Sequence, residues 1–537
     1  MIPVVDLFAG PGGLGEGFST FRDIQGQRFF RIALAIEKDE AAHATLLVRS
    51  FFRQFNDGCV PDDYYRFVRN EISLDELFRA FPAEATKALE VAWKAELGKV
   101  DESEVDKRIS KAIGDAKYWV LIGGPPCQPY SLIGRARIMG ESQRKFGNKM
   151  KMYEEDSRHF LYEEYLRIIG KHAPPVFVME NVKGLLSARV GGNLIIRKIL
   201  RDLEQLGYKL HPFVDYGIQR RLFDYFVDGQ DLRDFVICCE KHGIPQCRHR
   251  VILLGLRRDI HCQPRLLNIV KDRVSLSRVI GDLPKLRSQL SREKDSPEAW
   301  AAAIRKLVGD IDSIKNPKIQ AAIRNAAKRL GKYHDTGSSF VATAAKPMYM
   351  PDWFSDIRLG GVPNHETRFH MASDLRRYFF AACFAKIMKR SPFLFDFPKS
   401  LLPAHENINR GENKDIYFRD RFRVQLKNKP STTITAHIAK DGHYFIHPDP
   451  CQCRSLTVRE AARLQTFPDN YVFLGVRTEQ YRQVGNAVPP LLARQLAAVV
   501  YQVLKDACLQ IDSSDGSNHK GKEKLEHVPY PLEKHRT

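Results

Sequence analysis

The feature that most constrains the fold is a glycine-dense turn between a short apolar run and a helix start, in residues 3–18, PVVDLFAGPGGLGEGF. The apolar run before the turn predicts a buried strand, and the residues after it predict a helix. Glycines leave the backbone free to adopt positive φ and to lie against a ligand, while the first N–H groups of the helix are unpaired. This strand, turn and helix predict a doubly wound α/β domain with a nucleoside site at its strand ends.

A second strand end supports the nucleoside site. About 20 residues further on, the apolar run ALAIE ends in Glu37, where a doubly wound sheet offers a carboxylate to ribose hydroxyls. The glycine loop departs from the GxGxxG spacing, and it lacks the Gly-Lys-Ser/Thr ending of a phosphate-binding loop. We therefore expect an adenosine ligand without a triphosphate.

Charge and cysteine usage restrict the class of protein. The 84 Lys and Arg residues exceed the 64 Asp and Glu residues by 20 in a chain of 537, which favours a nucleic-acid partner. The 10 Cys residues show no disulfide spacing, and Cys451 and Cys453 stand too close for a zinc knuckle, so we expect a reducing cytoplasm and no metal site. We find no signal peptide and no apolar run near the about 20 residues that cross a bilayer, and therefore expect no membrane partner.

A cysteine lies in a proline-rich corner in residues 118–131, YWVLIGGPPCQPYS. The apolar run predicts a buried strand, and the Gly-Gly-Pro-Pro turn after it holds Cys127 at its tip. A thiol beside a nucleoside crevice can have a lowered pKa and attack as the thiolate. The alternative is an ordinary loop cysteine, because flanking prolines prove no reactivity.

Two further strands supply companion groups. Glu180 follows the apolar run Val176 to Met179, so that it could bind a protonated ring nitrogen in the same crevice, or cap a helix. In KHGIPQCRHRVILLGLRR, Arg248 and Arg250 alternate along a strand and should point the same way. Such a pair binds base edges or phosphates, or stays solvated at a sheet edge.

Six blocks, in serial order along most of the chain, resemble those of the DNA (cytosine-5)-methyltransferase family. They are DLFAGPGGLGEGF, GGPPCQPYS, MENVKG, QCRHR, RSLTVREAARLQTFPDNY and QVGNAVPP. The Pro-Pro-Cys-Gln and Glu-Asn-Val blocks are highly specific together, whereas the glycine loop is shared with many methyltransferases. The resemblance implies a Rossmann-like S-adenosylmethionine-dependent methyltransferase domain with an inserted target-recognition domain.

The resemblance also implies a mechanism and the residues that perform it. Cys127 would add to carbon 6 of a cytosine flipped out of the duplex, while Glu180 holds the N3 side of the ring. Carbon 5 would then attack the methyl group of S-adenosylmethionine, and loss of the carbon 5 proton with expulsion of Cys127 would leave 5-methylcytosine. Arg250, supported by Arg248, would fix the cytosine oxygen or a neighbouring phosphate. The base that removes the proton is not identified.

Family contact positions for the cofactor match residues spread along the chain. They are Phe8, Gly10, Gly12, Glu37, Pro126 and Asn486. One departure concerns the Asp-Ile or Asp-Val pair that holds the adenine amino group in the family. Its only apparent counterpart is Asn70-Glu71-Ile72, so we assign Glu71 to this role.

We expect the following organisation. Residues 1–256 form the catalytic and cofactor-binding domain, with a helical insertion at about 51–117; residues 257–424 form the target-recognition domain; residues 425–510 return to the catalytic domain; and the polar residues 511–537 are disordered. Candidates for contacts to bases or phosphates are Arg358, Asn364, His365 and Arg368. The segment Pro430 to Asp449 is strand-like.

The predicted protein is a monomeric, bacterial or phage-encoded modification enzyme that acts on duplex DNA and protects it from a cognate restriction endonuclease. The chain starts at its cofactor strand, with no room before it for chromatin-reading modules. One alternative is a transfer-RNA cytosine-5 methyltransferase, because a branch of the same family acts on that RNA. A second is a catalytically inactive DNA-binding regulator, against which the intact Cys127, Glu180 and Arg250 argue.

Overall fold

The computed structural model describes residues 1–125, 159–190, 193–216, 226–227, 230–403 and 420–514. At its centre is an eight-stranded sheet in the order β11-β13-β5-β4-β1-β2-β3, with β8 also paired to β13. The five neighbouring strands β3, β2, β1, β4 and β5 run parallel to one another, and β13 is antiparallel to β5, β8 and β11. The strand bounds are β1 Ile2–Leu7, β2 Phe30–Glu37, β3 Ala92–Lys94, β4 Val120–Gly123, β5 Val176–Val182, β8 Tyr208–His211, β11 Val236–Cys238 and β13 His249–Arg257.

The central strands are apolar on both faces because helices cover both. Alternate residues enter two separate hydrophobic cores, so that Val4 packs on one face of the sheet and Val5 on the other. The first core includes residues of α1 (Gly13–Ser19) and α18 (Pro490–Ser514), and the second includes residues of α6 (Glu102–Ile113), α9 (His159–His172) and α10 (Ile195–Gln205). This arrangement confirms the predicted doubly wound α/β fold.

The segment expected as a helical insertion, residues 51–117, contributes to the sheet. Its strand β3 pairs in parallel with β2, and its helix α6 buries Val105 and Ile109 in the second core. Between β2 and β3 lie the helices α2 (Glu40–Phe52), α3 (Asp62–Val68), α4 (Leu74–Ala80) and α5 (Pro82–Val91). Strand β3 has only three residues, too few to show a strand pattern in the sequence between the helical segments that flank it.

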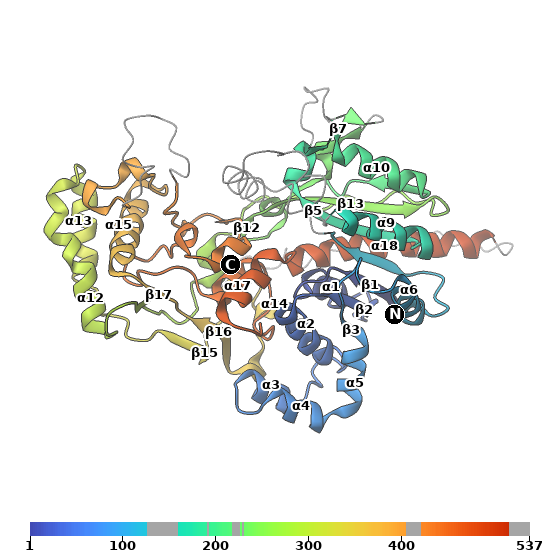
Figure 1. The fold of residues 1–537 in the computed structure, drawn as a ribbon, viewed down its shortest axis with the longest axis horizontal. Coiled ribbons are helices and arrows are strands. Elements are labelled where there is room, and N and C mark those ends of the chain that lie inside the picture. Colours follow the sequence, from blue (N-terminus) through green and yellow to red (C-terminus); the bar gives the residue numbers. More distant parts are fainter. Residues whose placement is uncertain (126–158, 191–192, 217–225, 228–229, 404–419, 515–537) are drawn as a thin grey trace.

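A second lobe stands apart from the sheet, on the left of Figure 1. Its helices are α12 (Pro297–Arg305), α13 (Pro317–Ala327) and α15 (Ala372–Met388), which enclose a core of their own with Trp300 and Tyr378. Ile260 and Leu283 pack instead in the first sheet core. Residues on both sides of the expected boundary at 257 therefore pack in the first sheet core.

The returning segment is less extended than predicted. Between Pro430 and Asp449 only β18 (Ser431–Thr432) is a strand, and it pairs with β12 (Gln246–Cys247). Two 3-10 turns follow, η10 (Ala436–Ala439) and η11 (His443–Phe445).

The C-terminal segments close the fold against the glycine loop. Helices α16 (Val458–Leu464) and α17 (Arg477–Asn486) lead into α18, which packs against α1. The sequence predicts no apolar run long enough to cross a membrane, but the helical segment Arg477–Cys508 is long and apolar enough by length and composition alone. Its most apolar window is 72% buried inside the protein, however, as expected for a core helix.

Four arginine side chains are fully buried: Arg248, Arg454, Arg459 and Arg463. Arg454 donates from both Nη atoms to Glu460 at 2.7 Å, and Arg459 donates to main-chain carbonyls, among them that of Pro363 at 2.9 Å. Arg463 pairs with Asp469 at 2.7 Å and with Asp282 at 2.8 Å. The block RSLTVREAARLQTF thus binds the distant segments around Asp282 and Pro363.

The contact between the two ends of the chain can be tested at Gly13. A Cβ added there would lie 2.3 Å from the carbonyl oxygen of Val488, so backbone must move. We expect Gly13→Ala to lower the free energy of unfolding by about 1–3 kcal/mol, measured by thermal or denaturant unfolding. The control is Gly309→Ala, whose added Cβ has no atom within 4 Å and which should be nearly neutral. Equal stability of the two variants would contradict this account of the closure.

Candidate active site

The carboxyl ends of the parallel strands bring the predicted motifs to one edge of the sheet. Gly124 directly follows β4, and a Cβ there would lie 2.3 Å from the carbonyl oxygen of Glu180. The Asn181 amide donates to the carbonyl of Pro125 at 3.4 Å. The Gly-Gly-Pro turn therefore packs directly on the Glu-Asn block. Pro126 and Cys127 follow this turn but lie outside the described residues.

The carboxylate of Glu180 forms an ion pair with Arg250. Its Oε1 lies 2.9 Å from Nε of Arg250, and the two side chains are 16% and 14% exposed. The antiparallel pairing of β5 and β13 places Arg250 opposite Val182, two residues beyond Glu180 on the same face of the strand. The structure thus unites two residues that the sequence separates by 70 positions.

Arg248 has a different environment from Arg250. It is buried, and its Nη1 donates to the carbonyls of Ile434 at 2.9 Å and Gly485 at 3.2 Å. Burial, together with the positive charge of Arg250, lowers the pKa of Arg248 to about 9. Gln246 also accepts a hydrogen bond from the Ile434 N–H at 2.7 Å. Arg248 therefore holds the C-terminal segments against the sheet, and its buried guanidinium is bonded to main-chain carbonyls.

The glycine loop and the end of β2 are joined by hydrogen bonds. The Gly10 N–H donates to Oε2 of Glu37 at 2.8 Å, and the Asp39 N–H donates to Oε1 at 2.7 Å. Burial raises the pKa of Glu37, against the effect of these two donors. Phe8, Gly10 and Gly12 all have positive φ, and the Cβ position of Gly10 has no atom within 4 Å. The loop thus has an open side next to a carboxylate, as a nucleoside site requires.

The predicted adenine contact lies in a different part of the molecule. Glu71 is exposed between α3 and α4, where it pairs with Arg69 Nε at 2.6 Å. The acidic and aliphatic pair that follows the third parallel strand is Glu96-Leu97, and the neighbouring Ala95 N–H donates to the Glu37 carbonyl at 3.2 Å. Sequence reasoning missed this pair because it missed β3.

Two of the suggested base readers are buried. The Asn364 amide donates to the Phe473 carbonyl at 2.9 Å, and both nitrogens of His365 are engaged, with Thr457 at 3.0 Å and the Pro284 carbonyl at 2.8 Å. The suggestion that these two side chains reach DNA is therefore wrong, since both are buried and bonded to groups within the protein. Arg358 lies near the surface and packs over the ring of Tyr65.

Comparison with known proteins identifies the family. The profile described as C-5 cytosine-specific DNA methylase matches residues 79–502. The chain belongs to this family. It is a DNA (cytosine-5-)-methyltransferase, which transfers a methyl group to carbon 5 of cytosine, as the resemblance of its six blocks implied.

Its relatives match over nearly their whole length. A type II methyltransferase of Bacillus paralicheniformis is 31% identical, over 93% of this chain and 99% of that protein. A type II methyltransferase of Thalassovita gelatinovora is 26% identical, over 92% of this chain and 98% of its own. A DNA (cytosine-5-)-methyltransferase of Aeropyrum pernix is 26% identical, over 93% of this chain and 98% of its own.

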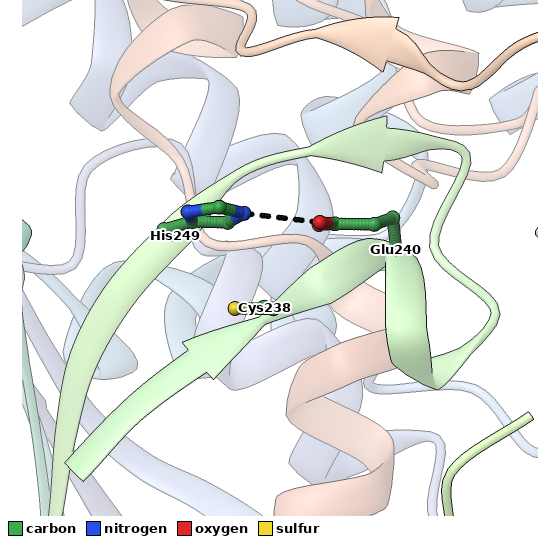
Figure 2. Close-up of side chains that lie close together, drawn as sticks. All are labelled: Cys238, Glu240 and His249. Atoms are coloured by element: carbon green, nitrogen blue, oxygen red, sulfur yellow. Dashed lines mark hydrogen bonds and ion pairs between the residues drawn. The ribbon is translucent and has the colours of Figure 1, made fainter. Parts of the chain in front are cut away.

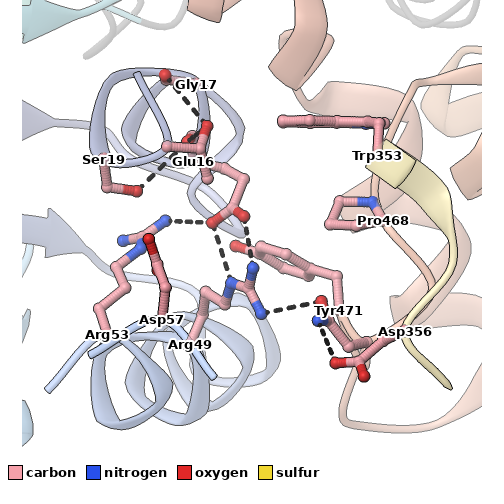
Figure 3. A network of polar contacts seen from close by, with 12 residues as sticks. Glu16, Gly17, Ser19, Arg49, Arg53, Asp57, Trp353, Asp356, Pro468 and Tyr471 are labelled. Atoms are coloured by element: carbon pink, nitrogen blue, oxygen red, sulfur yellow. Dashed lines mark hydrogen bonds and ion pairs between the residues drawn. The ribbon is translucent and has the colours of Figure 1, made fainter. Parts of the chain in front are cut away.

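A buried polar network supports the glycine loop of this methyltransferase (Figure 3). Glu16 of α1 pairs with Arg49 Nη2 at 2.5 Å and with Arg53 Nη2 at 2.8 Å. Arg49 also donates to Asn470 at 3.1 Å, and Asn470 donates to Asp356 at 2.8 Å. The path therefore runs from the helix of the glycine loop to the segment that precedes β16 (Gly361–Glu366).

The network makes the stability of the methyltransferase depend on Glu16 and on pH. Burial favours the protonated carboxyl, but Arg49 and Arg53 outweigh it and lower the pKa of Glu16 from 4.5 to about 2. A lowered folded-state pKa stabilises the fold above pH 4.5, and that stabilisation is lost as the pH falls toward 2. We expect Glu16→Gln to cost about 3–5 kcal/mol at pH 7, because it leaves buried arginines uncompensated.

Denaturant unfolding at pH 7, 5 and 3 measures this effect. The deficit of Glu16→Gln relative to the wild type should shrink between pH 5 and pH 3. Asp57→Asn is the control, since Asp57 pairs with Arg22 and Arg28 while 63% exposed and should cost at most about 1 kcal/mol. A deficit of Glu16→Gln that stays constant over this pH range would show that its ionisation is not the cause.

Proposed function

We propose that this methyltransferase is the modification enzyme of a restriction-modification system. It methylates cytosine within one duplex DNA sequence and so protects that sequence from a cognate endonuclease. The support is the name of its relatives, type II methyltransferases, which align over nearly their whole length. The excess of 20 positive charges suits a polyanionic duplex.

The observation that carries the proposed chemistry is the ion pair of Glu180 and Arg250 beside the turn that leads to Cys127. The Cys127 thiolate adds to carbon 6 of the flipped cytosine, the electron pair of the C5=C6 bond shifts to the C4–C5 bond, and that of C4=N3 moves to a protonated N3, which leaves an enamine with a nucleophilic carbon 5. Glu180 holds the N3 side and stabilises the protonated ring. Arg250 orients the Glu180 carboxylate and meets the cytosine oxygen or a neighbouring phosphate, while Arg248 keeps β13 in place.

The residues around the glycine loop fit a nucleoside cofactor. S-adenosylmethionine, when bound, supplies an electrophilic methyl group on its sulfonium sulfur. The open side of Gly10 accepts the cofactor, and Glu37 offers its remaining lone pairs to the ribose hydroxyls. Phe8 and Gly12 shape the loop, with Pro126 beside the nucleophile and the exposed Asn486 at the end of α17 as further contacts. We assign the adenine amino group to Glu96 instead of Glu71.

The second lobe is assigned to target recognition. Its core is separate from the two cores of the sheet, and Cys453, directly before the block with the buried arginines, donates to the Leu375 carbonyl of α15 at 3.1 Å. A duplex between the lobe and the strand ends would present its flipped cytosine to Glu180. The enzyme acts as a monomer, since one chain supplies both parts.

The first test measures methyl transfer. We expect the wild type to transfer tritiated methyl groups from S-adenosylmethionine to unmethylated duplex DNA, and Cys127→Ser to transfer none. Glu180→Gln should lower kcat about 10²–10⁴-fold. Cys262→Ser is the matched control, because this thiol contacts Asp506 and lies in no motif of the site. Full activity of Cys127→Ser would overturn the mechanism.

Sequencing that detects 5-methylcytosine then reads the modified sites in the same DNA. Methylation confined to one short sequence, which becomes resistant to a cognate endonuclease, supports the proposed setting. Methylated cytosines without a shared sequence would contradict it.

The second test separates the two candidate adenine contacts. We expect Glu96→Ala to weaken S-adenosylmethionine binding at least about 10-fold in calorimetry, because one hydrogen bond to a charged group is worth about 1.5–3 kcal/mol. Glu71→Ala should leave the affinity unchanged. The reverse result would return the role to Glu71.

A further inference from the structure

Three side chains of metal-ligating type lie together beside the site residues (Figure 2). They are Cys238 at the end of β11, Glu240 in the 3-10 turn η5 (Cys239–His242) and His249 at the start of β13. Their ligand atoms all lie within 4.8 Å of one another, and Nε2 of His249 is 3.0 Å from Oε1 of Glu240. Cys238 and His249 are register partners in the antiparallel pairing, so the backbone holds them together.

The geometry suits a small cation that prefers sulfur, nitrogen and oxygen. Around a tetrahedral zinc with bonds of about 2.0–2.3 Å, ligand atoms stand about 3.3–3.8 Å apart. The three atoms of this cluster reach such spacing if the widest separation closes by about 1 Å. Three protein ligands leave the fourth zinc position to water.

The buried carboxylate of Glu240 supplies a second, independent indication. Its side chain is 8% exposed, and among the described residues its Oε2 has no hydrogen-bond partner. Buried carboxylate oxygens ordinarily have a donor or a metal ion. Arg273 lies close enough to lower the pKa of Glu240 but donates no hydrogen bond to Oε2. The cluster therefore contains a buried carboxylate oxygen that has no hydrogen-bond donor among the described residues.

We propose that Cys238, Glu240 and His249 bind one Zn²⁺ ion, with water in the fourth position. Zinc binds the thiolate of Cys238 and an unprotonated nitrogen of His249, and any protons that these two atoms carry go to solvent. The ion would join β11 and η5 to the first residue of β13, directly before Arg250. It would therefore brace the strand that carries this arginine, without taking part in methyl transfer.

The experiment uses the full-length protein, freed of metal with a chelator and then titrated with ZnCl₂ against a chromophoric zinc indicator. We expect one equivalent of tight zinc by elemental analysis after gel filtration. Titration with Co²⁺ should give tetrahedral absorption together with a thiolate-to-cobalt charge-transfer band. Neither readout needs DNA or S-adenosylmethionine, so a failure here is distinct from a failure of the proposed function.

Matched variants decide the assignment. Cys238→Ser should weaken zinc binding more than about 100-fold, the upper range for loss of an indirect partner, and should abolish the charge-transfer band. Cys262→Ser should keep both, and His249→Asn provides a second variant if Cys238→Ser does not fold. The proposal is overturned if the wild type binds no zinc, or if a folded Cys238→Ser or His249→Asn variant binds it as tightly as the wild type.

Discussion

The close approach of the Val488 carbonyl to Gly13 is the contact on which the rest of the structure depends. It brings α18 against α1 and closes the catalytic core around residues from both ends of the chain. The second lobe can then be inserted at little cost, because the entropy of closing a loop grows only with the logarithm of its length. Glycine is required at position 13, since a side chain would displace the Val488 backbone that packs against the glycine loop.

Buried arginines hold distant segments of the chain against this core. Arg454, Arg459 and Arg463 are buried because carboxylates six residues away, such as Glu460 and Asp469, and carbonyls of distant segments, such as that of Pro363, meet their guanidinium groups. Such buried pairs add little net stability over apolar packing, but removing one partner is costly. They therefore suit a protein in which the relative position of distant segments matters.

Three consecutive residues around the start of strand β13 make contacts with three different parts of the protein. Arg250 meets Glu180 on one side, the preceding Arg248 anchors the C-terminal segments, and His249 between them faces Cys238 and Glu240. Alternation along an extended chain makes this division feasible, because neighbouring side chains point to opposite faces. A zinc ion bound at the start of this strand would therefore help to fix the position of Arg250.

The sequence by itself determined the local elements and the edge where they meet. Parallel strands share one carboxyl edge, so the positions of Gly10, Glu37 and Glu180 after apolar runs were enough to place them together. Cys127 was predicted on the same grounds, and it lies outside the described residues. The family followed from six short blocks, whose order along the chain is a property of the sequence alone.

Only the tertiary structure decided what depends on contacts between distant segments. A strand of three residues carries too little pattern to be found, so the sequence does not show that Glu96 follows a strand of the sheet. Polar side chains such as Asn364 and His365 resemble ligand-binding residues in a sequence, but their partners lie about 90–110 positions away. Cys238, Glu240 and His249 become a cluster only through the pairing of β11 with β13, because hydrogen-bond register between strands is set by the whole sheet.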